Sequence, residues 1–326
     1  SYGANPEKSY QWGYVYKGDL LITNNGDKDY SNARKMENVA FGIAEEHGSA
    51  SICSIGFDGI WGAGFFRSGN LARVPISNNV LPSDVLCFQG LCSSETFDPV
   101  DDWCNCEGTD STVYYLYPAL EKTLRNAGSP IIGIYMPASP LEFSSLLKSK
   151  ITYNAGMLFT GDDAIHNKHY QNPAHAKVTS DNDGQHRYWS IPMTSIQVFC
   201  GSASNPNLSF PVFPLKDFCV TNQCFLDTGV PKNVFPKSIV DQINSCTDKN
   251  GSVRIQMDGG ELIMDMQNLK TLEVLGASES YAGHLILGFP TWLWYYTVFD
   301  FGSNIEGSAE ITFIYTPPVG VTTIGN

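Results

Sequence analysis

The sequence predicts a mostly β protein with a few short helices, and three observations support this class. Short segments of β-branched, aromatic and alternating apolar residues recur along the chain, separated by turn-forming residues. The 30 glycines and 18 prolines are scattered without a period, which favours many turns and excludes collagen. Helix signals are confined to two segments. A length of 326 residues fits either two lobes or one large β domain.

Two strand pairs are the clearest elements. Residues 252–257 alternate apolar and polar side chains, and residues 261–266 follow them after a turn at 258–260. Residues 295–300 and 309–314 form a second pair of the same kind. Further short strands are expected at residues 20–22, 131–136, 157–159 and 196–199.

Two short helices complete the prediction. Residues 118–127 begin with proline, which is favoured in the first turn of a helix, and Gly128 follows as a stop signal. Residues 234–243 form the second predicted helix, with Ile239, Val240 and Ile243 expected to face inward.

Composition and charge limit the possible partners. Only 16% of residues are charged and 12% are aromatic, so the chain can bury a sizeable core and general disorder is not expected. The formal charge of −13 makes nucleic acid a poor partner and favours a neutral or cationic partner or an acidic compartment. No apolar stretch is long enough to span a membrane. The longest, residues 285–299, contains Gly288 and Pro290 and is predicted to be core.

The nine cysteines indicate disulfides and the secretory pathway, in a secreted protein or one of the lysosome or vacuole. Four cysteines lie between Cys87 and Cys106 at spacings that fit no common zinc site. Asn207 and Asn250 begin sequons compatible with a glycoprotein. The polar stretch 166–183 contains three histidines but is expected to be a surface loop. No metal site is predicted.

One tripeptide points to chemistry. Asp227, Thr228 and Gly229 directly follow an apolar run that ends at Leu226. A strand that ends in Asp can present its carboxylate at a turn, and Gly lets a backbone N–H approach the carboxylate oxygen. The Thr hydroxyl can tie the turn to a neighbouring loop. Taken alone, this tripeptide also occurs in ordinary turns.

The motifs around Asp227 resemble the C-terminal lobe of the pepsin-like aspartic proteases. The tripeptide Ile286, Leu287 and Gly288 follows Asp227 by about 60 residues, and residues 295–300 then read Y-Y-T-V-F-D. In that family the D-T-G strand lies beside an I-L-G strand. The resemblance also implies a small disulfide loop between Cys219 and Cys224. Two upstream segments, residues 156–162 and 188–193, resemble segments of the same lobe.

The first half of the chain resembles the N-terminal lobe of the same family. Residues 57–64 are similar to its F-D-G-I-x-G-L-G segment, and residues 118–136 resemble the helix and strand that close the lobe. Tyr2 and Gly3 are similar to the start of the flap that covers the substrate. The resemblance therefore implies a bilobal pepsin-like acid protease fold with an incomplete N-terminal lobe. The expected domains are an N-terminal lobe at 1–150, with a Cys-rich insertion at about 66–117, and a C-terminal lobe at 151–326.

The family uses two catalytic aspartates, and this sequence contains only one D-T-G motif. Two hypotheses follow. In the first, a companion N-terminal segment or chain supplies the other Asp, and the protein is an aspartic endopeptidase that cleaves extended polypeptides without a cofactor. In the second, it is a catalytically inactive pepsin-like protein used for binding or structure. Val230, which stands where the family usually has Ser or Thr, favours the second hypothesis, because Val cannot donate a hydrogen bond.

Overall fold

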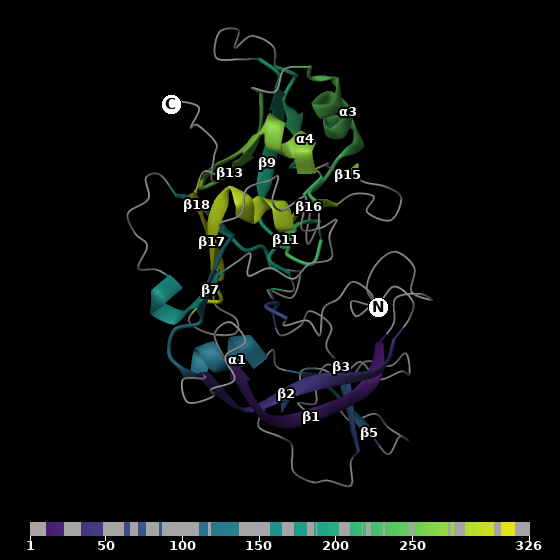
Figure 1. Ribbon diagram of the computed structural model, residues 1–326, viewed down its shortest axis with the longest axis vertical. Helices are drawn as coiled ribbons and strands as arrows, with labels where there is room; N and C mark the ends of the chain where they lie inside the picture. Colours follow the sequence, from purple (N-terminus) through teal and green to yellow (C-terminus); the bar gives the residue numbers. More distant parts are fainter. Residues whose placement is uncertain are drawn as a thin grey trace. The chain divides into compact units, whose positions relative to one another are not determined.

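The described part of the chain is mostly β with a few short helices, as the sequence predicts (Figure 1). Two compact units make up the chain, Ser1–Asn126 and Ala127–Asn326. The computed structural model describes residues 11–22, 34–47, 62–65, 71–75, 85–86, 111–116, 119–136, 157–164, 173–180, 186, 188–201, 209–216, 218–219, 223–230, 232–247, 251–272, 275–276, 284–302 and 308–316.

The described part of the N-terminal unit contains two antiparallel sheets. In the first, two long strands pair from Gln11 opposite His47 to Ile22 opposite Arg34, with two irregularities in register. The second sheet has the order β3-β5-β4. The strands are β1 (Gln11–Ile22), β2 (Arg34–His47), β3 (Leu71–Pro75), β4 (Val85–Leu86) and β5 (Ser111–Leu116). The four cysteines of the predicted Cys-rich insertion and residues 57–61 lie outside the described residues.

The helix predicted at 118–127 is confirmed as α1 (Ala119–Asn126). Leu120 and Leu124, four residues apart on one face, are buried. Glu121 is also buried and forms an ion pair with the half-buried Arg125, one turn later, at 2.8 Å. Gly128 follows with φ +83°, a left-handed conformation that glycine adopts without strain and that ends the helix.

The described part of the C-terminal unit contains three sheets, with the orders β10-β9-β13-β14, β11-β16-β12-β15 and β7-β6-β17-β18-β8. The strands are β6 (Ile131–Tyr135), β7 (Met157–Thr160), β8 (Ala174–Lys177), β9 (Met193–Phe199), β10 (Phe213–Pro214), β11 (Cys224–Asp227), β12 (Val234–Phe235), β13 (Ser252–Met257), β14 (Gly260–Asp265), β15 (Leu275–Gly276), β16 (Leu285–Gly288), β17 (Tyr295–Asp300) and β18 (Glu310–Tyr315). The helices are α3 (Lys237–Ser245) and α4 (Met266–Leu272), with 3₁₀ turns η3 (Gly161–Ala164) and η5 (Phe289–Leu293).

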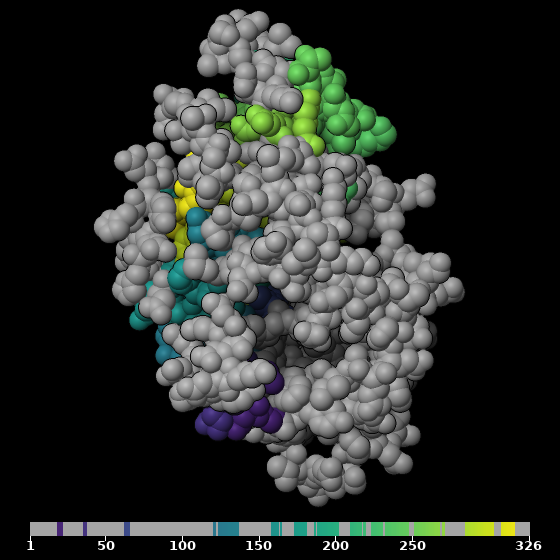
Figure 2. All heavy atoms as spheres, in the orientation of Figure 1, coloured from purple at the N-terminus to yellow at the C-terminus, as the bar shows by residue number. Residues whose placement is uncertain are grey.

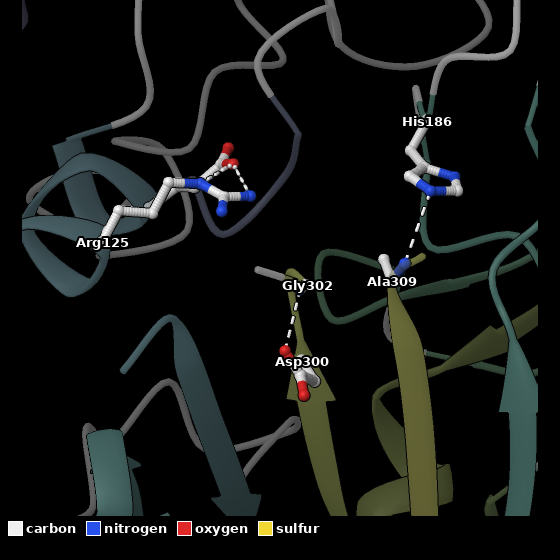
Figure 3. A network of polar contacts seen from close by, with 6 residues as sticks. Arg125, His186, Asp300, Gly302 and Ala309 are labelled. Carbon is white, nitrogen blue, oxygen red and sulfur yellow. Dashed lines mark hydrogen bonds and ion pairs between the residues drawn. The ribbon is translucent and has the colours of Figure 1, made fainter. Parts of the chain in front are cut away.

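Both predicted strand pairs are confirmed. Strand β13 pairs with β14 from Ser252 opposite Asp265 to Met257 opposite Gly260. Strand β17 pairs with β18 throughout. The turn after β17 is held by Asp300, whose Oδ1 accepts a hydrogen bond from the N–H of Gly302, as Figure 3 shows.

Two predictions are corrected by the structure. The stretch predicted as a surface loop contains β8, because Ala174 and Ala176 are buried in alternation and the strand pairs with β18. Two small alanines give only a weak periodic signal in the sequence. The second helix begins at Lys237 and not at Val234, because Pro236 disfavours helical backbone in the residue before it, and residues 234–235 instead form β12.

Helix α3 lies at the surface of the molecule (green in Figure 2). Its exposed side carries Lys237 and Asp241, which form an ion pair at 2.7 Å. Its inner side buries Ile239, Val240 and Ile243, as the predicted helix pattern requires.

The core of the C-terminal unit is rich in aromatic side chains. Trp189 packs edge-on against Phe299 and Phe301, with ring centroids 4.8 and 4.9 Å apart. The apolar run at 285–299, predicted to be core, is almost entirely buried. In the described residues no helix is both long and apolar enough to cross a membrane.

Two disulfides of very different loop length should differ in their contribution to stability. Cys200 and Cys246 are 46 residues apart in sequence, whereas Cys219 and Cys224 are separated by 5. In the chain-entropy model the first bond restricts the unfolded chain more, by about 4 against about 2 kcal/mol. We expect the double Ala variant of the long pair to lose more unfolding free energy in urea. An equal or larger loss in the short-pair variant would contradict this explanation.

Tyr295 links two sheets and should make stability depend on pH. Its hydroxyl donates to the carbonyl of Ile263 at 3.0 Å and accepts from the N–H of the same residue. Burial raises the pKa of Tyr295, so its contribution is complete below the unfolded value of about 10 and is lost as pH rises.

We expect Tyr295→Phe to lower the unfolding free energy by about 1–3 kcal/mol at neutral pH, because the Ile263 N–H loses its partner. Above pH 10 the wild type should lose up to about 1.4 kcal/mol per pH unit through this group, and the variant should decline less steeply. Tyr315, whose pKa is also raised by burial, is present in both proteins, so the variant should keep part of the pH dependence of stability. Parallel pH curves from urea unfolding would contradict the assignment to Tyr295.

Candidate active site around Asp227

Asp227 is the last residue of β11 and lies on the half-exposed face of that strand. The residues of β11 alternate, so Cys224 and Leu226 are buried while Phe225 and Asp227 are only half-buried. The strand runs parallel to β16, and Asp227 lies opposite Gly288. The I-L-G strand therefore lies beside the D-T-G strand, as the family resemblance implies.

A tight turn directly after β11 orients the carboxylate. The N–H of Gly229 donates to Oδ1 of Asp227 at 2.8 Å, and the N–H of Val230 donates to the carbonyl of Asp227 at 3.2 Å. Thr228 and Gly229 are exposed. In the part of the chain that the structure describes, no hydrogen bond to Oδ2 is present, so this oxygen can interact with a water or a ligand.

A disulfide precedes the strand. Cys219 and Cys224 are bonded, with their Cα atoms 5.0 Å apart, and this is the pair that the resemblance implies. The N–H of Cys219 donates to the carbonyl of Leu215. The first residue of β11 is thus joined covalently to a loop that itself has a backbone anchor. The second bond, Cys200–Cys246, was not assigned from the sequence.

After the turn the chain crosses the end of β16 at very short range. A Cβ atom on Gly288 would overlap the carbonyl oxygens of Val230 and Lys232, so only glycine fits at this position. The N–H of Phe289 donates to the carbonyl of Val230 at 2.8 Å. The crossing explains why the I-L-G motif ends in glycine.

Asn233 is a site residue that the sequence analysis missed. Its side chain is 1% exposed, and its Oδ1 accepts hydrogen bonds from the Gly288 N–H at 2.8 Å and from Thr291 Oγ1 at 3.1 Å. Both partners lie more than 50 residues away in sequence. A single Asn in a loop carries no local signal for such contacts.

Aromatic side chains lie on the same face of β11 as Asp227. The ring of Tyr188 stacks on Phe225 at 5.5 Å, and His284 contacts Phe225 edge-on at 6.0 Å. Tyr188 remains 43% exposed. The segment that carries it runs along β11, since Trp189 accepts a hydrogen bond from the N–H of Leu226. An accessible aromatic surface therefore lies on the strand that ends in the carboxylate.

The remaining predicted site residues fall into two groups. Ile286, Leu287 and Gly288 are buried in β16 and support the site without reaching solvent. Tyr2 and Gly3 lie outside the described residues. No group of three or more metal-binding side chains occurs among the residues that the structure describes.

Comparisons with solved structures show a distant similarity in fold. No family model matches the sequence, and no curated protein matches it. The fold is similar to the solved structure of basic 7S globulin from soybean, with a TM-score of 0.41 and 15% sequence identity. The match covers 68% of this chain and 61% of the globulin chain, so this chain spans less than two thirds of that protein. A similarity at this level carries no conclusion about activity.

The two glycines next to Asp227 should respond differently to alanine. Gly288→Ala should lower the unfolding free energy by about 1–3 kcal/mol, because the added Cβ collides with backbone atoms of the crossing loop. Gly229→Ala should cost less than about 1 kcal/mol, because its Cβ would meet only Asp227 Oδ1 at 3.1 Å and its φ is not positive. Urea unfolding of both variants measures the difference. Equal losses would contradict the tight crossing at Gly288.

Proposed function

We propose that this chain belongs to an aspartic endopeptidase in which Asp227 is one of two catalytic carboxylates. The observation that carries the proposal is the geometry of Asp227 at the end of a buried parallel strand pair. One carboxylate oxygen accepts a hydrogen bond from a backbone N–H, and none to the other oxygen is present in the part of the chain that the structure describes. The resemblance of the surrounding motifs to pepsin-like aspartic proteases supports the same chemistry.

The reaction requires a second carboxylate. Two carboxylates at hydrogen-bonding distance share one proton, since both cannot ionise at that separation. The ionised group accepts a proton from the attacking water, and the protonated group donates to the peptide carbonyl oxygen. A companion N-terminal segment or chain would supply the second Asp, because this sequence has only one D-T-G motif. Water is the nucleophile, and no cofactor takes part in these steps.

The substrate in this proposal is an extended polypeptide. Residues 1–150 and 151–326 would form its two lobes, with Tyr2 and Gly3 in the flap. The partly exposed Tyr188, whose ring stacks on Phe225, offers an apolar surface for a substrate side chain on the strand that ends in Asp227. The two disulfides support a location in the secretory pathway, as a secreted, lysosomal or vacuolar protein.

Asp227→Asn should abolish cleavage of a denatured protein in mild acid. Asn is nearly isosteric but cannot accept the proton of the attacking water, so the rate should fall by about 10²–10⁴-fold. The assay uses the native material, with any companion segment, between about pH 3 and pH 7. The wild-type rate should follow a bell-shaped curve, because the carboxylate pair must hold a single proton. A statine-type peptide should inhibit it.

Asp265→Asn is the matched control. Asp265 also ends a strand, and its Oδ1 also accepts the N–H of the residue two positions later at 2.8 Å. It should retain activity. If the wild type, with the companion segment shown to be present, cleaves nothing in this pH range, the proposal fails and the inactive binding protein becomes the better hypothesis.

A further inference from the structure

We propose that Asn233 is the positioning residue for Asp227, an assignment that rests on the proposed peptidase function. Asn233 lies outside the D-T-G motif, and the resemblance to the pepsin-like proteases assigned no role to Asn233. The inference comes from the path of the chain between β11 and β12 and from the hydrogen bonds that fix this path.

Between Asp227 and Val234 the chain passes from one side of strand β16 to the other. Strand β11 lies on one side of β16 in parallel, and β12 lies on the other side in antiparallel orientation, with Val234 opposite Ile286. Residues 228–233 must therefore cross over the end of β16. We call this segment the crossing loop.

The described residues of the crossing loop, 228–230 and 232–233, have no strand pairing of their own, so side chains and single backbone contacts must fix them. On the Asp227 side, the N–H of Val230 donates to the carbonyl of Asp227, and the carbonyl of Val230 accepts from the N–H of Phe289. On the far side, Asn233 Oδ1 accepts from the Gly288 N–H and from Thr291 Oγ1. The loop is thereby attached at both ends to the segment from Gly288 to Thr291.

The amide of Asn233 suits this place better than the alternatives. Its oxygen accepts two hydrogen bonds, and its Nδ2 points toward Met264 Sδ on β14 at 3.6 Å, a weak acceptor. A leucine would leave the buried Gly288 N–H without a partner. A neutral carboxyl keeps the accepting oxygen, whereas an ionised carboxylate in this buried position is disfavoured.

The contacts form a continuous path from Asn233 to the proposed catalytic group. Asn233 Oδ1 accepts a hydrogen bond from the N–H of Gly288, and the N–H of the next residue, Phe289, donates to the carbonyl of Val230. The N–H of Val230 in turn donates to the carbonyl of Asp227. Gly229, between Asp227 and Val230, donates to the carboxylate. Loss of the Asn233 side chain should release the crossing loop and with it the orientation of the carboxylate.

The experiment compares Asn233→Leu, Asn233→Asp and a matched control in the full chain. The control is Tyr296→Phe, which also removes a buried side-chain hydrogen bond, from Tyr296 Oη to the carbonyl of Ala164 at 2.7 Å, at a residue outside the crossing loop. Two readouts are used. The pH dependence of the Gly229 amide chemical shift in NMR reports the protonation of Asp227 without requiring activity, and kcat and KM are measured for peptide cleavage.

We expect Asn233→Leu to change the Gly229 titration curve and to lower kcat by about a hundredfold, with a smaller change in KM, since small misplacement of a catalytic group has effects of this size. Asn233→Asp keeps an oxygen that can accept both hydrogen bonds, so it should behave like the wild type in mild acid. Tyr296→Phe should reduce stability and leave both readouts unchanged.

Two results separate this inference from the proposed function. If the wild type cleaves no peptide, the peptidase proposal fails, and the Gly229 titration still decides whether Asn233 positions Asp227. If the Gly229 titration and kcat of Asn233→Leu match the wild type, Asn233 is only a structural residue and the inference is overturned. If Asn233→Leu does not fold, the smaller Asn233→Ala variant is measured in its place, and a Gly229 titration and kcat that match the wild type in that variant overturn the inference.

Discussion

The close passage of the crossing loop over Gly288 is the constraint on which the site depends. Because Gly288 has no side chain, the backbone of the crossing loop can occupy the space next to it. The chain can therefore pass from β11 to β12 with β16 between them. This arrangement places the end of β11 at the half-exposed edge of a buried sheet. The carboxylate of Asp227 is thereby placed at the end of a strand that pairs with the buried strand β16, which suits a group that must hold its geometry.

The same principle of close approach recurs in the aromatic core. Gly133 leaves the space that the Tyr296 hydroxyl occupies on its way to the carbonyl of Ala164. The Tyr295 hydroxyl satisfies both backbone groups of Ile263 on β14. Adjacent tyrosines of β17 thus reach different elements on opposite faces of the strand, and their polar atoms are satisfied inside a largely apolar interior.

The orientation of the Asp227 carboxylate is determined in part by contacts within this chain. The backbone N–H of Gly229 fixes one carboxylate oxygen, and the disulfide Cys219–Cys224 fixes the start of the strand. These contacts determine the direction of a carboxylate but cannot make it both donate and accept a proton in one step. In the proposed mechanism that ability requires a second carboxylate, so the chemistry belongs to a pair and not to Asp227 by itself.

The sequence by itself determined the features that arise from neighbouring residues. The pairs β13–β14 and β17–β18 follow from alternation around a turn, and α1 follows from its proline start and glycine stop. Asp227 was found because its tripeptide is contiguous.

Only the tertiary structure decided the features that depend on distant partners. They are the hydrogen bonds of Asn233, the pairing of Cys200 with Cys246, and the strand β8, whose two alanines are buried because β18 lies beside them. A contact between residues 46 or 55 positions apart leaves no periodic trace in the sequence, since the packing of the whole unit, and not local conformational preference, brings the two residues together.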